Sequence, residues 1–256
     1  VAICAAQEAP EQLKRCLDST RLALEAAGSA GEILLCGPEA VAGPSHWVEA
    51  PVGWDAPQAH NLLLREAFRR GAEVVVLATS RGMFHPQSIR ALLRVLTAHD
   101  QRALVEATHF PQERPRLFDS VTLEVGWASS ACLAIPRALF EVLDGFDQAL
   151  AGDAADVDFS WRARAQGFAV LVAPDAMFLL PGDHTLRDAA AWRSRVANAV
   201  LLARKWRARE FEIQALSELA RVRAAVPTAM PAPIPEDWRG AADFAHQLSF
   251  SPVRWS

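Results

Sequence analysis

The chain lacks the features that mark several broad classes of protein. No run of apolar residues approaches the roughly 20 that a membrane-spanning helix needs. Acidic and basic residues nearly balance, 30 against 26, and the net charge of −4 argues against nucleic acid as a partner. The cysteines form no CxxC pair and have apolar neighbours, so we expect buried free thiols in a reducing compartment. These absences favour a cytoplasmic globular protein, which the apolar fraction of 51% and the charged fraction of 22% fit.

Two common phosphate-binding signatures are also missing. The first apolar segment is not followed by GxGxxG, and no GxxxxGK[ST] occurs anywhere in the chain. The glycines of these motifs let the backbone approach a phosphate closely, so the dinucleotide-binding and P-loop designs are disfavoured. A protein with neither motif needs another way to hold a phosphorylated ligand.

The apolar periodicity nevertheless alternates between strand and helix, which predicts an α/β fold with a mostly parallel sheet covered by helices on both faces. A later segment, 122–147, mixes a strand, a turn and a short helix, and 168–180 is interpreted as a pair of strands. Beyond about residue 186 long helices and then a Pro-rich stretch follow. The expected early strands are 1–6, 31–37, 72–78 and 102–110, and the expected helices are 9–28, 58–71, 85–100 and 153–167.

Four segments resemble, in the right order, those of family 2 glycosyltransferases. They are "VAICAAQEAPEQLKRCLDS" at the start, "NLLLREAFRRGAEVVVL", "GWASSACLAIPRALFEVLDGFDQAL" and "GDAADVDFSWRARAQGFAVLVAPDA". The resemblance implies a GT-A fold, a Rossmann-like single domain with a central mixed sheet over residues 1–185. Residues 186–256 would then form a helical extension and tail. The most similar branch is the rhamnosyltransferase-like one, which decorates bacterial surface polysaccharides.

The resemblance implies an inverting transfer of a sugar from a nucleotide-diphosphate sugar to a glycan, lipid-linked or protein acceptor. Asp156 aligns with the family's catalytic base, which takes the proton of the acceptor hydroxyl as its oxygen attacks. Asp153 takes this role if the alignment slips, and Asp158 is the third candidate. The acids also have a structural interpretation, because carboxylates at a helix start favour capping and the dipole. Asp158 in particular can pair with Arg162 at i+4.

The sequence departs from the family where acids are expected. Cys36 replaces a nucleoside-binding Asp, and Ala155 replaces the Glu before the base. The Asp-x-Asp motif falls on Thr79, Ser80 and Arg81, which offer neutral oxygens and a cation. A guanidinium matches the geometry of phosphate, so Arg81 is predicted to replace the metal. No cofactor is then required, and Mn²⁺ or Mg²⁺ is disfavoured. The alternatives are that Arg81 is a solvated loop residue and that the domain is an inactive binding or scaffold module.

The resemblance assigns further contacts around the ligand. Trp127 stands before a small-residue turn and is a candidate to stack on a sugar, with a core tryptophan as the alternative. The segment 187–209 interleaves cations with tryptophans, as in helices that lie on the inner face of a membrane or dock on a protein. Packing on the core is the other interpretation of that segment. The remaining candidates are Ala5, Ala6, Gln7 and Glu8 for the nucleotide, His184 for phosphate, and Ser129 for the acceptor.

Overall fold

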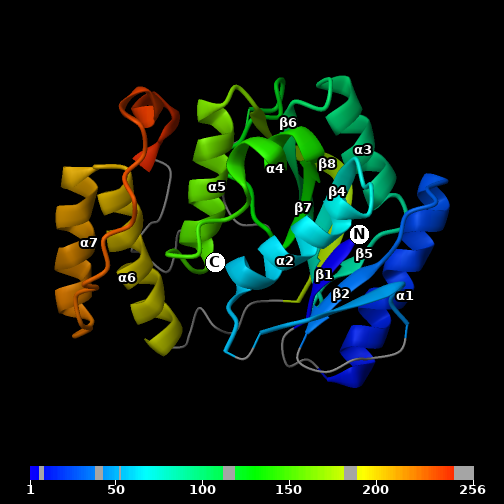
Figure 1. Ribbon diagram of the computed structural model, residues 1–256, viewed down its shortest axis with the longest axis horizontal. Coiled ribbons are helices and arrows are strands. Elements are labelled where there is room, and N and C mark those ends of the chain that lie inside the picture. The colour runs from blue at the N-terminus through cyan, green and yellow to red at the C-terminus, as the bar shows by residue number, and fades with distance from the viewer. Residues whose placement is uncertain (6–8, 38–42, 52, 112–118, 182–188, 245–256) are drawn as a thin grey trace.

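The computed structural model describes residues 1–5, 9–37, 43–51, 53–111, 119–181 and 189–244. Within these residues, one eight-stranded sheet has the strand order β3-β2-β1-β4-β7-β6-β8-β5. Helices cover both of its faces (Figure 1). The α/β class and the central mixed sheet are therefore confirmed.

The strands share one functionally important edge. The pairs β1–β2, β1–β4, β2–β3 and β6–β8 are parallel, whereas β7 runs antiparallel to both β4 and β6. The carboxyl ends of β1, β2, β4 and β6 and the start of β7 therefore lie at the same edge. The strands are β1 (Ala2–Cys4), β2 (Leu34–Gly37), β3 (His46–Glu49), β4 (Val74–Thr79), β5 (Met83–Phe84), β6 (Ala103–Pro111), β7 (Cys132–Pro136) and β8 (Ala169–Leu180).

The helices form two layers against the sheet and a third beyond it. The pair α1 and α3 packs on one face, and α2, α4 and α5 pack on the other. Two further helices, α6 and α7, lie outside α5 (Figure 1). The helices are α1 (Pro10–Ala27), α2 (Ala56–Arg69), α3 (Ser88–Ala98), α4 (Arg137–Leu143), α5 (Asp153–Ala165), α6 (Ala189–Lys205) and α7 (Arg209–Arg221), with a 3-10 helix at Glu236–Ala241.

The sequence interpretation needs correction at three strands. The segment expected to be a strand pair is the single strand β8, whose register against β6 shifts between Ala107 and Thr108. Ala107 pairs with Ala173, but Thr108 pairs with Met177, so the residues between them bulge out of the ladder. The short strands β3 and β5 were not expected, because four and two residues give too little periodicity to detect.

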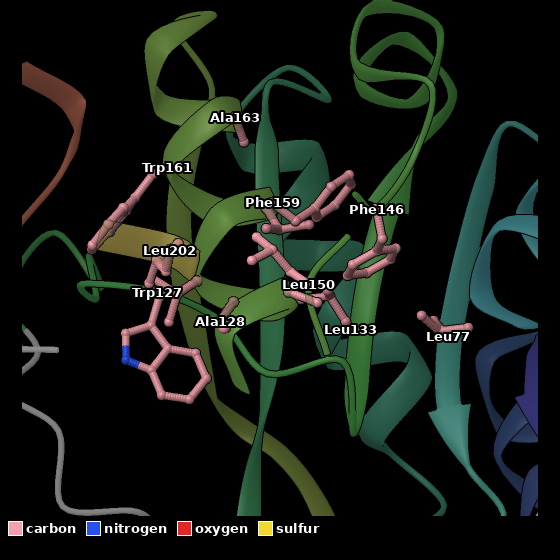
Figure 2. Packing of buried hydrophobic residues seen from close by; sticks show 14 of the residues in the cluster. Leu77, Trp127, Ala128, Leu133, Phe146, Leu150, Phe159, Trp161, Ala163 and Leu202 are labelled. Atoms are coloured by element: carbon pink, nitrogen blue, oxygen red, sulfur yellow. The ribbon is translucent and has the colours of Figure 1, made fainter. Parts of the chain in front are cut away.

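Helix α5 is buried on every side. All residues from Ala154 to Ala163 are buried, which is the pattern of a helix enclosed by other elements rather than lying on a surface. Figure 2 shows Phe159 and Trp161 pointing to opposite sides of α5. Phe159 stacks on Phe146 at 4.3 Å between ring centroids, and Trp161 meets Trp206 edge-on at 5.2 Å. The sheet side and the α6 side thus enclose α5 together.

Candidate active site

Backbone hydrogen bonds join the carboxyl ends of three neighbouring strands. Ala5 N donates to Cys36 O at 2.8 Å, and Ser80 N donates to Cys4 O at 3.1 Å. In the ladders, Cys4 stands opposite both Cys36 and Thr79. The structure therefore brings together the predicted nucleotide-side residues Ala5, Cys36, Thr79 and Ser80.

The same run of hydrogen bonds continues to helix α5. Thr79 N donates to Ala131 O at 3.0 Å, and Ala131 N donates to Ser129 Oγ at 3.3 Å. Next to them, Ser130 N donates to a carboxylate oxygen of Asp156 at 3.1 Å. The structure thus links the predicted nucleotide side to the predicted base through the turn at 129–131. We call the residues that these hydrogen bonds join the carboxyl edge; they are Cys4, Ala5, Cys36, Thr79, Ser80, 129–131 and Asp156.

The three acids of α5 have three different environments. Asp153 pairs with Arg195 of α6 at 2.6 Å. Asp158 is 0% exposed and accepts from Arg162 Nε at 2.7 Å, as the i+4 spacing predicted. It accepts in addition from two groups at the end of α6, Lys205 Nζ at 2.9 Å and Trp206 Nε1 at 3.0 Å. Asp156 contacts the turn at 129–131, where its carboxylate accepts from Ser130 N.

Arg81 stands in a tight turn directly after β4, and it is exposed. Its amide lies 3.4 Å from Thr79 Oγ1, and its carbonyl accepts from Gln12 Nε2 of α1 at 2.9 Å. The next residue has to be glycine, since a Cβ on Gly82 would lie 2.0 Å from a ring atom of Phe178. The backbone of the turn is therefore fixed, with a guanidinium-bearing residue at the solvent side of the carboxyl edge.

Residues 79–81, on which the Asp-x-Asp motif was expected to fall, lack the carboxylates that a divalent cation prefers. Mn²⁺ and Mg²⁺ prefer carboxylate oxygens, whereas Thr79 and Ser80 supply hydroxyls and Arg81 is cationic. Within the described ranges, no group of three or more His, Cys, Asp and Glu residues is placed to hold a metal ion. Ser80 is 0% exposed, and its Oγ has no hydrogen-bond partner among the described residues.

Sequence reasoning missed a buried acid and histidine near the carboxyl edge. Glu106 and His109 both lie on β6, and Oε1 of the first is 3.6 Å from Nε2 of the second. Burial, followed by the proximity of Glu106 and Cys16, raises the pKa of the Cys132 thiol at the start of β7. The available signal was two polar side chains inside the otherwise apolar run "ALVEATHF".

Two predicted acceptor-side residues are buried, and four other predicted site residues fall outside the described structure. Trp127 is 0% exposed and packs in the core, which is the alternative left open by the sequence (Figure 2). Ser129 is buried, and its hydroxyl supports the turn that leads to β7. Ala6, Gln7, Glu8 and His184 fall outside the described residues. All four cysteines are buried free thiols, as expected.

The described part of the basic segment 187–209 packs on the protein core, which is the other interpretation left open by the sequence. Helix α6 places Val196, Ala199 and Leu202 in the same core as α5. Its cations are also used internally, since Arg204 Nε donates to Glu212 at 2.8 Å and Arg193 Nε to the carbonyl of Val222 at 3.2 Å. Across the described residues, no helix is both long enough and apolar enough to cross a bilayer.

No protein-family model and no curated protein sequence matches the chain. Solved structures do match. One is the mannosyltransferase PcManGT from Pyrobaculum calidifontis in complex with GDP-Man and Mn²⁺, with a TM-score of 0.57 and 16% identity over 94% of this chain and 73% of that chain. Another is S. aureus TarS 1–349, with a TM-score of 0.51 and 12% identity over 86% of this chain and 72% of that one. These similarities show that the fold, including its mixed sheet, is that of known glycosyltransferases.

Proposed function

We propose that this protein is an inverting glycosyltransferase that uses a nucleotide-diphosphate sugar. The observation that carries the proposal is the position of Asp156, whose carboxylate accepts from Ser130 N at 3.1 Å at the end of the carboxyl edge. Ligands of open α/β sheets bind at the carboxyl ends of the strands. The shared fold with solved glycosyltransferases supports the same class.

In the proposed reaction, Asp156 accepts the proton of an acceptor hydroxyl while the hydroxyl oxygen attacks the anomeric carbon of the donor. The bond from that carbon to the diphosphate breaks, and the nucleoside diphosphate leaves with the electron pair. Attack opposite the leaving group inverts the anomeric configuration. Asp153 and Asp158 are weaker candidates for the base, because both are held in ion pairs.

We propose that Arg81 stabilises the departing diphosphate. Negative charge builds on the leaving group in the transition state, and a fixed cation close to that charge lowers the barrier strongly. A guanidinium presents parallel N–H donors that match phosphate oxygens. The donor set at Thr79 and Ser80 supports a reaction without a bound metal ion.

The sequence blocks support narrower proposals about the acceptor and the pathway. They favour family 2, its rhamnosyltransferase-like branch, and a glycan, lipid-linked or protein acceptor in bacterial surface polysaccharide or glycoconjugate synthesis. A cytoplasmic location and contact with a nucleotide sugar follow from the same proposal.

A second function is favoured by the lost acids. Cys36, Thr79 and Ala155 stand where the family has carboxyl or carboxamide side chains, which suits a domain that binds a sugar nucleotide or a partner without catalysis. For that function, Asp156→Asn and Arg81→Ala would leave the biological role intact.

Titration calorimetry against UDP-, GDP- and dTDP-linked sugars, in Mn²⁺ and in EDTA, tests the proposal. We expect one donor class to bind equally in both conditions and to release nucleoside diphosphate when an acceptor is supplied. Binding without release would favour the inactive module. A lack of binding to every donor would overturn the glycosyltransferase proposal and leave only a module that binds a partner other than a sugar nucleotide.

A further inference from the structure

Helix α6 is attached to α5 and to the loop before it at three levels. Near its start, Arg195 pairs with Asp153 at 2.6 Å. Asn198 Oδ1 accepts from the amide of Ala151 at 2.8 Å. At its end, Lys205 Nζ lies 2.9 Å from Asp158, and these contacts follow one side of α6 from residue 195 to residue 205.

Lys205 is a buried cation shared between two carboxylates. Its Nζ donates to Asp147 at 2.5 Å as well as to Asp158, and the residue is 6% exposed. A buried ammonium is strongly disfavoured unless it is paired and hydrogen-bonded. A shift of α6 along α5 would separate these charges, so the network fixes the relative position of the two helices.

The loop before α5 is held from its other side as well. Asn61 of α2 forms a double hydrogen bond with the backbone of Phe146, through Nδ2 to the carbonyl at 2.8 Å and from the amide to Oδ1 at 2.7 Å. Arg162 donates to the carbonyl of Gly145 at 2.8 Å. Asp147 is therefore a fixed point on this loop, and Lys205 joins it to α5.

These contacts bracket Asp156. Asp153 lies three positions before it and Asp158 two positions after it on a continuous helix, and both are bound to α6. Displacements of about 1 Å in catalytic groups are sufficient to reduce rates by orders of magnitude. The position of the proposed base thus depends on a helix that supplies no group to the reaction.

We propose that α6 is a positioning element for Asp156, with Lys205, Trp206, Arg195 and Asn198 as its positioning residues. The inference rests on the proposed function. It assigns a role in the reaction to a segment for which the sequence suggested a helical extension that contacts a membrane, a partner or the core.

Adjacent residues of α6 provide a matched pair of variants. Lys205 bonds to the α5 side, whereas Arg204 bonds outward, to Glu212 of α7 and to the carbonyl of Pro227 at 2.6 Å. Their side chains are similarly buried, 7% and 15% exposed. Lys205→Met is expected to lower kcat about 10-fold or more with the donor KM within about 2-fold, because geometry is lost and donor contacts are kept. For Arg204→Met, both kcat and the donor KM are expected to stay within about 2-fold of the wild-type values.

Trp206→Phe is the second variant, in case Lys205→Met does not fold. It keeps an aromatic ring against Trp161 and removes the Nε1 hydrogen bond to Asp158. We expect a smaller fall in kcat, about 3-fold, at an unchanged donor KM, on the scale of one lost hydrogen bond partly replaced by water. A purely structural role would lower the melting temperature and leave kcat unchanged below it.

Hydrogen exchange at the Ser130 amide separates this inference from the proposed function. That amide donates to Asp156, so its protection reports the position of the carboxylate whether or not a donor is found. Loss of protection in Lys205→Met but not in Arg204→Met supports the inference, even if wild-type protein transfers no sugar. Equal kcat and equal exchange in the two variants, with an active wild type, would overturn it and leave the proposed function standing.

Discussion

The two ends of the carboxyl edge are held in different ways. At the donor end, comprising Ala5, Cys36 and 79–81, neighbouring strands are joined by main-chain hydrogen bonds. At the acid end, comprising Asp156 on α5 and the surrounding residues of α6, buried side-chain ion pairs hold the helix. Main-chain contacts do not depend on side-chain identity, whereas removing one partner of a buried ion pair leaves a charge without compensation. The backbone of the donor end is therefore insensitive to most side-chain exchanges, with Gly82 as an exception, whereas the position of the acid end depends on specific charges.

The largest effect on turnover is expected for Asp156, the proposed base at the acid end. Asp156→Asn keeps the shape and the acceptor oxygen for Ser130 N but removes the base, so turnover should fall by about 10²- to 10⁴-fold with donor binding nearly unchanged. Steady-state kinetics with calorimetry measures both. Asp144→Asn, at an exposed aspartate paired with Arg65, is the control. Full activity in Asp156→Asn would move the base to another residue.

At the donor end, charge is expected to matter at one position. Arg81→Met should weaken donor binding by about 10- to 100-fold, the range for a hydrogen bond to a charged group, and Arg81→Lys should recover part of it. Arg94→Met, at an exposed arginine of α3 that pairs with Asp175, should bind donor like the wild type. A strict requirement for Mn²⁺, or an unchanged affinity in Arg81→Met, would contradict the role proposed for Arg81.

The backbone of the donor end is expected to be sensitive at Gly82. A Cβ there would overlap the ring of Phe178, and Gly82→Ala should lower the free energy of unfolding by about 3 kcal/mol, the upper range for overpacking. Gly240→Ala is the matched control, because a Cβ on Gly240 would meet no described atom within 4 Å and its φ is ordinary. Equal urea midpoints for the two variants would show that the turn can yield.

The smallest expected effect is on the pH dependence of stability, which two groups beside the loop before α5 control in opposite ways. Burial lowers the pKa of His60 on α2 from 6.5 to about 4. Between these values the unfolded chain binds a proton that the folded chain excludes, so stability falls as the pH falls through that window. The free energy of unfolding should drop by roughly 2 kcal/mol from pH 7 to pH 5, and His60→Leu should remove most of this slope.

Asp147 at the acid end provides the contrast. Burial alone would raise its pKa, but hydrogen bonds from Lys205 and Ala149 and the nearby cations lower the pKa overall. The stabilising contribution of the Asp147 carboxylate is therefore complete at pH values above the ordinary aspartate pKa of about 3.9. It is lost only as the pH falls through the lower pKa that Asp147 has in the folded protein. Asp147→Asn should leave the slope between pH 7 and pH 5 unchanged. If Asp147→Asn flattened the dependence of the unfolding free energy on pH between pH 7 and pH 5, the titrations of His60 and Asp147 would be coupled.

The sequence predicted the elements that carry strong local signals. Helix α1 begins at Pro10 and ends at Ala27, and it is followed by Gly28, whose left-handed backbone has a φ of 64°. Strands β1, β2 and β4 were found because they are short apolar runs bounded by turn residues. The bulge in β8 could not be predicted, because it is set by pairing with β6, far away in the chain.

The candidate site was predictable in part. The resemblance singled out Asp156 and residues 79–81, and the structure brings Asp156 and Thr79 to one edge. The sequence could not tell which of the three acids between 153 and 158 is held in an ion pair. That depends on Arg195 and Lys205, which lie far along the chain and which no local pattern indicates. Glu106 and His109 were missed for a related reason, since positions i and i+3 of a regular strand face opposite sides, and these two flank the point where the pairing of β6 with β8 shifts register.

The main-chain hydrogen bonds of the donor end also bear on how such proteins diverge. A sheet edge that is joined by amides and carbonyls can keep its form while side chains are exchanged. Identity to a solved structure then falls to 16% while 94% of the chain still superposes on the same architecture. For this scaffold, the course of the backbone is shared where the sequence is not.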